Sequence, residues 1–368
     1  MVITRAPVRI SFGGGGTDLA PYYTRFGGFV ISAAITRYTY VAAQRPPTPR
    51  VRISSADYRM TETFAPGEAP VVQDPLILPK AAVERFMDHG LRRVGVDLFL
   101  SSDVPPGTGL GSSSAMSVSL LRTLATYLDR DLGREAAADL ACWLEIERLE
   151  RPIGKQDQYA SAYGGLNAIE FTANGTEVVP LGLPRDVVAT LKSRLLLFST
   201  GQSRDSADIL CEQRENTKAQ TVVVETLHEI KGLAREMHRA LRTQALDDFG
   251  RLLDETWKLK KRLSNKVSSS EIDDWYAAAR EAGALGGKIT GAGGGGFLLL
   301  YVPLMRKAAV RRALVSYGLR EMTFDFDFMG AQVMAGAETG KVRRAAIRRL
   351  AHPQVALVAA VAARRMVG

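Results

Sequence analysis

The chain has 368 residues, of which 46% are hydrophobic and 24% are charged, a composition typical of a globular protein with two domains or one large one. No run approaches the roughly 18–20 apolar residues of a membrane-spanning helix, and two cysteines are too few for a disulfide framework. Transmembrane and disulfide-stapled classes are therefore excluded, and we expect a cytoplasmic protein.

The net charge of +9 is concentrated at the C-terminal end. Seven lysines and arginines and no acidic residue follow Gly340, so the rest of the chain is nearly neutral. A nearly neutral body does not indicate nucleic-acid binding, and we expect no nucleic-acid partner. Residues 338–368 form a basic extension that either packs on the second domain or docks on an anionic lipid surface or a partner.

In chain order, apolar and β-branched runs predict strands over residues 2–10, 29–34, 38–43, 50–54 and 96–101, and a helix over 76–89. We expect 29–34 and 38–43 to pair with each other. Ser112, Ser113 and Ser114 stand where an N-cap belongs, ahead of a helix that continues to about residue 128. Further predicted elements are helices over 134–149 and 156–163 and a hairpin over 166–180.

A composition shift at residues 184–189 predicts a domain boundary, so we divide the body of the chain into domains at 1–185 and 186–337. The second domain has predicted strands over 194–199, 297–302 and 324–328, long helices through 205–261 and a helix over 272–282. The fold class that this mixture predicts is α+β.

Two glycine-rich segments indicate a nucleotide. Residues 105–114 read Pro-Pro-Gly-Thr-Gly-Leu-Gly-Ser-Ser-Ser and open a predicted helix, and residues 291–297 read Gly-Ala-Gly-Gly-Gly-Gly-Phe. Backbone N–H groups of such loops, with the positive end of a helix, bind phosphate. A P-loop is excluded because no Gly-Lys pair is followed by Ser or Thr. We interpret the dinucleotide-like spacing of Gly291, Gly293 and Gly296 as accidental, because a strand-like run follows it instead of a helix.

Three segments in order resemble one family, the GHMP kinases, which includes galactokinase, homoserine kinase and mevalonate kinase. Residues 105–114 resemble its phosphate loop, and residues 288–297 resemble its third motif. Ala6-Pro7-Val8-Arg9-Ile10-Ser11 with Thr17-Asp18 is similar to its N-terminal substrate motif, with Val8 where glycine is usual. The four glycines before Thr17, and the run Pro152-Ile153-Gly154-Lys155-Gln156-Asp157, resemble the branch of D-glycero-D-manno-heptose 7-phosphate kinases and related sugar kinases.

The resemblance, which runs from about residue 1 to 336, implies an N-terminal domain like the second domain of ribosomal protein S5 and a ferredoxin-like C-terminal domain, with ATP between them. It implies ATP and Mg²⁺ as cofactors. The implied ATP-binding residues are Pro106, Gly107, Thr108, Gly109, Leu110, Gly111, Ser112, Ser113 and Ser114.

Magnesium takes hard oxygen ligands, and by resemblance Ser113 supplies one of them. The carboxylate partner should come from the helix carrying Glu145 and Glu147, which lie on nearly opposite helix faces. We predict Glu147 as the ligand, with Glu145 as the alternative.

Asp157 begins a short predicted helix, where it could face the acceptor hydroxyl and either accept its proton or orient it. By resemblance Arg9 lies nearby and screens the transferred group. The alternative role for Asp157 is that of a helix N-terminal acid stabilised by the dipole.

By resemblance Asp18 holds sugar hydroxyls, and the Gly13–Gly16 run lets a polyol pack against the backbone. We expect the Gly293–Gly296 backbone to close over the active site. The predicted substrate-binding residues of these segments are Gly15, Gly16, Thr17, Asp18, Gly293 and Gly294. Asp18 could instead cap the turn that follows it. A phosphorylated substrate also needs cations, for which Lys155, Arg37 and Arg204 are candidates by position. Lys288 is either a site residue or a partly buried strand-end charge.

We therefore expect an ATP- and magnesium-dependent kinase that phosphorylates a sugar or sugar phosphate. The favoured acceptor is the anomeric hydroxyl of D-glycero-D-manno-heptose 7-phosphate, giving the 1,7-bisphosphate for nucleotide-sugar biosynthesis. The alternatives are a GHMP kinase for another sugar such as L-fucose, and a catalytically silent sugar sensor of the same fold. The sequence does not determine whether the chain forms a homodimer.

Overall fold

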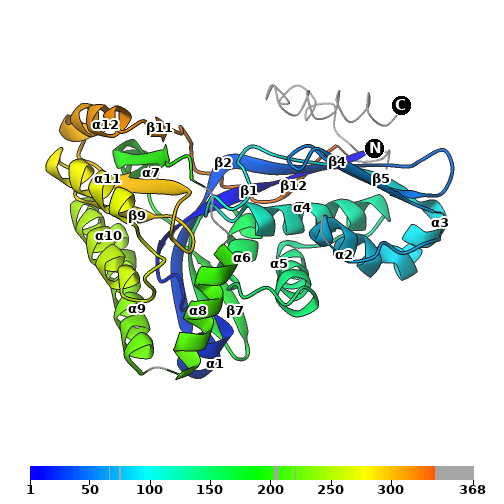
Figure 1. The fold of residues 1–368 in the computed structure, drawn as a ribbon, viewed down its shortest axis with the longest axis horizontal. Helices are drawn as coiled ribbons and strands as arrows, with labels where there is room; N and C mark the ends of the chain where they lie inside the picture. Colours follow the sequence, from blue (N-terminus) through cyan, green and yellow to red (C-terminus); the bar gives the residue numbers. More distant parts are fainter. Residues whose placement is uncertain (66, 74–75, 203–205, 220, 336–368) are drawn as a thin grey trace.

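Two β-sheets organise the part of the chain that the computed structural model describes, which is residues 1–65, 67–73, 76–202, 206–219 and 221–335 (Figure 1). The predicted basic extension at 338–368 and the candidate phosphate ligand Arg204 lie outside the described residues. Among the helices of those ranges, none has the length and apolarity to cross a membrane.

The first sheet has eight strands in the described residues. Its main path is β12-β1-β2-β5-β3-β4, and β6 and β7 join it through the first half of β2. The strand bounds are β1 (Val2–Gly13), β2 (Gly28–Gln44), β3 (Val51–Ser55), β4 (Met60–Phe64), β5 (Val96–Ser102), β6 (Leu166–Thr172), β7 (Gly175–Pro180) and β12 (Gln332–Ala335).

The prediction that 29–34 and 38–43 pair with each other is wrong, because both belong to the single 17-residue strand β2. β2 pairs with β1 along one side, and with β6 and then β5 along the other. Residues 35–37 are Ile-Thr-Arg, which contain none of the Gly, Pro, Asn or Asp that a hairpin turn favours. The strand therefore continues through them.

Helices cover one face of the first sheet, and α4 (Ser112–Tyr127) runs along it against β1 and β2 (Figure 1). Its cap position is Gly111, at φ 73°, and Ser112 already lies in the first turn, so the predicted serine N-cap is wrong. The predicted helix at 134–149 is α5 (Arg134–Cys142) continued by the π-helical segment η2 (Trp143–Arg148). The other helices of this unit are α1 (Ala20–Phe26), α2 (Ile77–Phe86), the π-helical η1 (Met87–Leu91), α3 (Arg92–Val94) and α6 (Gln156–Tyr163).

The second sheet has the antiparallel order β11-β8-β10-β9. Its strands are β8 (Leu195–Ser199), β9 (Gly286–Ile289), β10 (Phe297–Tyr301) and β11 (Arg320–Glu321). With helices between β8 and β9 and between β10 and β11, this is the βαββαβ arrangement of a ferredoxin-like unit, as predicted. The helices of this half are α7 (Arg185–Arg194), α8 (Ser206–Ala219), α9 (Thr221–Arg242), α10 (Leu246–Lys261), α11 (Ser270–Glu281), the 3₁₀ turn η3 (Leu304–Arg306) and α12 (Lys307–Ser316).

One hydrophobic core joins the two sheets. Alternate residues of β10, such as Phe297 and Leu299, face the large cluster that also contains the core of the first sheet. The intervening Leu298 and Leu300 face a second cluster with Trp275 of α11. Because both faces of β8 and β10 are covered, these strands appear in the sequence as unbroken apolar runs.

The last described segment returns to the first sheet. Phe326 forms an isolated bridge with Ile35, and β12 pairs with β1. The predicted strand at 324–328 is therefore reduced to this single bridge. The last described residues of the predicted second domain, 186–337, therefore belong to the first sheet.

The shared core predicts the cost of truncating Leu299, which is fully buried. Leu299→Ala should lower the free energy of unfolding by about 2–5 kcal/mol, because it removes buried apolar atoms and leaves a cavity. Met305→Ala, at a side chain 92% exposed, is the matched control and should change it by less than about 0.5 kcal/mol. Chemical denaturation measures both, and an equal effect of the two substitutions would contradict this description of the core.

Candidate active site

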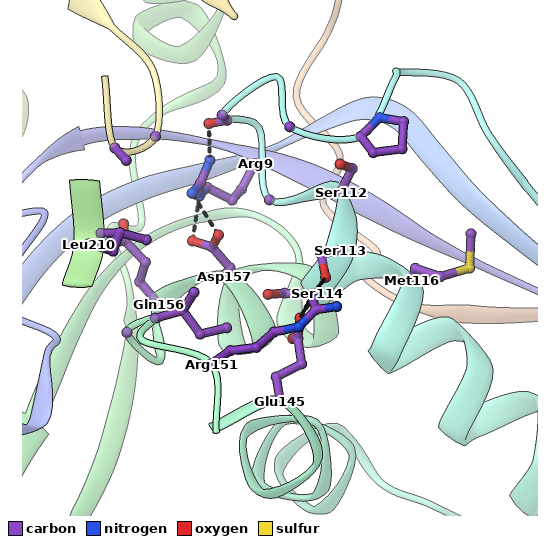
Figure 2. Close-up of a pocket in the computed structure, with 18 of the residues that line it drawn as sticks. Arg9, Ser112, Ser113, Ser114, Met116, Glu145, Arg151, Gln156, Asp157 and Leu210 are labelled. Carbon is purple, nitrogen blue, oxygen red and sulfur yellow. Dashed lines mark hydrogen bonds and ion pairs between the residues drawn. The ribbon is translucent and has the colours of Figure 1, made fainter. Parts of the chain in front are cut away.

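A cavity of about 720 Å³ lies where the two halves meet. Its walls come from the end of β1, the loop between β5 and α4, the start of α4, the turn between η2 and α6, and the helix α8 (Figure 2). Helix α10 adds Lys260 to the wall. Most of the predicted site residues line it: Arg9, Gly15, Gly16, Asp18, Pro106, Gly107, Gly109, Gly111, Ser112, Ser113, Ser114 and Asp157.

The two glycine-rich segments touch each other at one edge of this cavity. A Cβ added at Gly291 would lie 2.4 Å from the Cα of Gly109, and one added at Gly109 would lie 2.5 Å from the carbonyl oxygen of Thr290. Both glycines also have positive φ, at 66° and 75°. The backbones can approach this closely only without side chains, which explains why both segments are rich in glycine.

The start of α4 presents to the cavity backbone donors that have no acceptor among the described residues. The first N–H bonded back to the cap residue is that of Ala115, which donates to Gly111 O at 2.9 Å. The N–H groups of Ser112, Ser113 and Ser114 precede it in the first turn, where a helix has no acceptor of its own for them. These three residues line the cavity, so its wall here is suited to an anion.

Arg9 and Asp157 form a bidentate ion pair inside the cavity (Figure 2). Arg9 Nε donates to Asp157 Oδ1 at 2.6 Å, and Nη2 donates to Oδ2 at 2.7 Å. The remaining nitrogen, Nη1, donates to the carbonyl oxygen of Gly109 at 2.5 Å. The pair thus connects β1, the loop before α4 and the first turn of α6, and it brings together the two residues predicted to be catalytic.

A second polar cluster joins Ser113, Glu145 and Arg151 (Figure 2). Ser113 Oγ donates to Glu145 Oε1 at 2.7 Å, and Arg151 Nη1 donates to Ser113 Oγ at 2.6 Å. Arg151 also lies 3.6 Å from Glu145 Oε1, and Gln158 Nε2 donates to Oε2 at 2.9 Å.

The prediction that Glu147 faces this site is wrong. Glu145 is fully buried, whereas Glu147 is exposed on the other side of η2. Only one of Glu145 and Glu147 points inward, as expected, but the helical periodicity of the sequence does not determine which one. The π-helical turn, which the sequence did not signal, fixes Glu145 opposite Ser113.

Asp18 is buried in the loop between β1 and α1, where neighbouring donors hold it. The Gly16 N–H donates to Oδ1 at 3.0 Å, and Gln156 Nε2 donates to Oδ2 at 2.9 Å. A Cβ at Gly154 would lie 1.9 Å from Oδ2, so only glycine fits there. Burial, with a smaller contribution from the Asp157 charge, raises the pKa of Asp18 above its ordinary value.

Three buried polar atoms around Asp18 have no hydrogen-bond partner within the described chain. They are Ser11 Oγ, Gln156 Oε1 and Gln213 Nε2, and all three residues line the cavity. A Cβ at Gly15 would lie 3.7 Å from both Ser11 Oγ and Gln156 Nε2, so these groups surround the glycine run. Buried polar atoms in proteins are normally paired, so this end of the cavity is suited to a ligand with several hydroxyl groups.

Several predicted ligands lie outside the cavity. Thr17 is buried and donates to the Gly14 and Phe29 carbonyls, at 2.7 and 3.1 Å, so it fastens the loop. Thr108 donates to Pro105 O at 2.8 Å, and Leu110 is a core residue whose carbonyl accepts from Arg9 N–H. Gly293 and Gly294 pack on Val267, because the third motif turns away from the cavity after Ala292.

Two of the predicted phosphate cations, Lys155 and Arg37, also lie elsewhere. The Lys155 ammonium lies over the Tyr23 ring at 5.2 Å, and Arg37 donates to the carbonyls of Thr36 and Thr323. The cations that do line the cavity, besides Arg9, are Arg151, Lys260 and Lys288. Sequence analysis missed Arg151 and Lys260 and left Lys288 undecided.

The apolar end of the cavity was also missed. It is lined by Leu76, Ile77, Leu78, Leu100, Val104 and Met116. These residues come from three separate segments, and each fits an ordinary core position in its own helix or strand. A lone sequence therefore carries no signal that distinguishes them from core residues.

Comparison with known proteins identifies the family. The model of the GHMP kinases N-terminal domain matches residues 78–165, and that of the GHMP kinases C-terminal domain matches 237–319. The chain is 31% identical over 313 residues to the D-glycero-alpha-D-manno-heptose 7-phosphate kinase of Campylobacter jejuni, covering 84% of this chain and 92% of that one. It is 28% identical over 330 residues to the bifunctional fucokinase/GDP-fucose pyrophosphorylase of Arabidopsis thaliana, covering 82% of this chain and 30% of that protein.

A solved structure agrees with these matches. The structure of a D-glycero-D-manno-heptose 1-phosphate kinase from Bacteroides thetaiotaomicron superposes with a TM-score of 0.77 at 30% identity, covering 92% of this chain and all of that one. Because the alignments span both sheets and the cavity between them, the chain belongs to the GHMP kinase family.

Proposed function

We propose that the protein is a sugar kinase that transfers the γ-phosphoryl group of ATP to a hydroxyl of a sugar phosphate. The favoured acceptor is the anomeric hydroxyl of D-glycero-D-manno-heptose 7-phosphate. The observation that carries this proposal is the Arg9–Asp157 pair, which lies between the anion-binding start of α4 and the polar end of the cavity around Asp18. A phosphoryl donor and a hydroxyl acceptor bound at these two ends would meet at Asp157.

The shape and chemistry of the cavity support ATP as the donor. Its apolar end, with Leu78 and Met116, would take the adenine base, and the free N–H groups at the start of α4 would take the phosphates. Gly107 and Gly109 line the wall between them without side chains.

Ser113 and Glu145 fit a magnesium ion. A hydroxyl and a carboxylate are hard oxygen ligands, and Mg²⁺ in nucleotide sites uses only one or two protein ligands besides phosphates and water. Arg151 lies against both side chains, and this supports a preference of these oxygens for positive charge. When bound, the metal would neutralise charge on the ATP phosphates.

Asp157 would act on the acceptor hydroxyl. Its carboxylate is partly exposed to the cavity, and two of its lone pairs are engaged by Arg9. The remaining lone pairs can accept the hydroxyl proton or orient it as the oxygen attacks the phosphoryl group. The Arg9 guanidinium, fixed by three hydrogen bonds, would stabilise the negative charge that builds up in the transition state.

The unpaired groups of Ser11, Gln156 and Gln213 favour a polyhydroxylated acceptor, and the 31% identity to a heptose 7-phosphate kinase favours the heptose. The fucokinase relative supports a second candidate, an unphosphorylated sugar such as L-fucose. The positions of Lys155 and Arg37, both outside the cavity, do not decide between the two acceptors. The cytoplasmic location expected from the sequence stays a prediction.

The test of the proposed function is ADP release with Mg-ATP across an acceptor panel of heptose 7-phosphate, mannose 6-phosphate, fucose, galactose and mevalonate. We expect turnover with the heptose phosphate alone. Turnover with free fucose only would identify the unphosphorylated sugar as the acceptor. No ADP release with any acceptor, although ATP binds, would contradict the proposal.

Replacing Asp157 tests its role. Asp157→Asn should lower kcat by about 10²- to 10⁴-fold, because the amide cannot accept the hydroxyl proton. Affinity for ATP, measured by calorimetry, should change little because the substitution leaves the N–H groups at the start of α4 and the apolar end of the cavity in place. Near-normal turnover in this variant would show that the carboxylate is not required.

The two glutamates of η2 provide a matched pair for the metal. Glu145→Gln should raise the magnesium concentration for half-maximal activity about tenfold or more and weaken Mn²⁺ binding measured by electron paramagnetic resonance, because it removes the charged ligand. Glu147→Gln, two residues away and exposed, should leave both unchanged. If circular dichroism shows that both variants are folded and their magnesium dependence is equal, Glu145 is not a ligand of the metal.

A further inference from the structure

Two buried lysines line the cavity without a role in the chemistry above. Lys260 lies on α10 and Lys288 on β9, and they are 6% and 2% exposed. Both contribute to the wall of the cavity near Arg9 and Asp18. Lysines are almost never buried to this extent unless they are paired.

Neither ammonium has a carboxylate partner among the described residues. Lys260 Nζ donates to the carbonyl oxygen of Gly291, and Lys288 Nζ donates to that of Phe12 at 3.4 Å. The cations nearest to them, which are Arg9 and each other, repel, and Asp18 is the acid that attracts both. The two arginines of the cavity differ in this respect, because Arg9 is paired with Asp157 and Arg151 with Glu145.

The acceptors of these hydrogen bonds show where the lysines lie. Gly291 packs on Gly109 of the loop that precedes α4, and Phe12 directly precedes the glycine run that leads to Asp18. The two ammonium groups therefore lie between the segment assigned to the ATP phosphates and the segment assigned to the acceptor.

We propose that Lys260 and Lys288 form an anion subsite that binds a phosphate group of the bound ligands. The proposal rests on the kinase function above. Phosphate oxygens would supply the negative charge that the chain does not, and a lysine ammonium binds phosphate as a compact point charge. The phosphate is either the acceptor's own or the γ-phosphoryl group in transfer, and the experiment below distinguishes these sources.

The protonation of Lys288 gives the subsite a pH dependence. Burial and, to a smaller extent, the Arg9 charge lower the pKa of Lys288 to about 7, and Asp18 opposes this shift. The pKa of Lys260 is also lowered, by burial first and then by the charges of Lys288 and Arg9. A bound phosphate favours the charged ammonium and raises this pKa. Binding at pH 8 should therefore take up protons, and affinity should be full below pH 7 and fall as the pH rises above it.

The experiment compares ligands that differ by one phosphate group, using calorimetry on the full chain. One pair is heptose 7-phosphate and the unphosphorylated heptose, and the other is Mg-ATP and Mg-ADP. The variants are Lys260→Met and Lys288→Met, which keep the length of the side chain and remove its charge. Lys258→Met is the control, because Lys258 is on the same helix with its side chain 66% exposed, and its partner Asp254 keeps Tyr276 and Arg280 as further partners.

We expect Lys260→Met and Lys288→Met to reduce the affinity advantage of the phosphorylated member of one pair by about tenfold or more, and Lys258→Met to leave it unchanged. A loss confined to the heptose pair assigns the subsite to the acceptor's phosphate, and a loss confined to the ATP pair assigns it to the γ-phosphoryl group. Unchanged advantages in both pairs would overturn the proposal.

Two further readouts separate this subsite from a structural role and from the proposed function. Without ligand, the methionine variants should unfold at the same temperature as the wild type or higher, because they remove an uncompensated buried charge. A lower unfolding temperature with normal phosphate discrimination would mean that the lysines are structural, which overturns the proposal. The ATP pair and a titration with inorganic phosphate can be measured without an acceptor. If the wild type is inactive on every acceptor and the methionine variants still lose phosphate binding, the proposed function is refuted and the subsite is kept.

Discussion

The ion pair between Arg9 and Asp157 fixes the geometry on which the rest of the cavity depends. Arg9 uses its planar fork for both carboxylate oxygens and its third nitrogen for the Gly109 carbonyl. One side chain of β1 thereby positions the loop before α4 and the first turn of α6, which are about 50 residues apart in the chain. The side chain of Arg9 is only 6% exposed, so breaking either contact would leave a charge buried without its partner. The donor and acceptor ends of the cavity are thus held at a fixed separation before any ligand binds, which is the positioning that phosphoryl transfer requires.

Three consecutive residues at the start of α6 distribute the remaining contacts. Gln156 donates to Asp18, Asp157 pairs with Arg9, and Gln158 donates to Glu145. Successive residues of a helix point about 100° apart, so one turn reaches the acceptor end, the centre and the Ser113 cluster at the same time. This arrangement needs the helix to begin at Gln156, and the segment from Pro152 to Lys155 provides the break before it. A shift of one residue in this helix would exchange all three partners.

The features that sequence analysis predicted are those in which the residue type itself carries the chemistry. Glycines that permit backbone contact, the serine-rich start of a helix and the Arg9 and Asp157 pair were all found from their local motifs. Features set by tertiary packing were not. The inward face of η2 depends on a π-helical turn, and the pairing of β2 depends on neighbours far along the chain. Lys260 did leave a signal, because it continues the buried positions Leu253 and Trp257 of α10 at helical spacing. A charged residue on an apolar stripe indicates either a buried ion pair or a ligand site. Lys260 was difficult to recognise because it lies in the charged run Lys258-Leu-Lys-Lys, next to more exposed lysines.

The balance of charge in the cavity separates the groups that support the fold from those available to a ligand. Each arginine has a carboxylate within ion-pair distance, so its charge is compensated without any ligand. Within the described parts of the chain, Lys260 and Lys288 contact only carbonyl oxygens and share an attraction to Asp18. Burial raises the pKa of Asp18 itself. Burying an uncompensated ammonium is unfavourable, so the ligand-free protein holds a local destabilisation that an anionic ligand relieves. Selection for stability alone would replace these lysines by apolar residues of similar length, as α10 already has at the preceding positions of the same face. Their presence at the junction of the donor and acceptor segments is therefore better explained by binding than by folding.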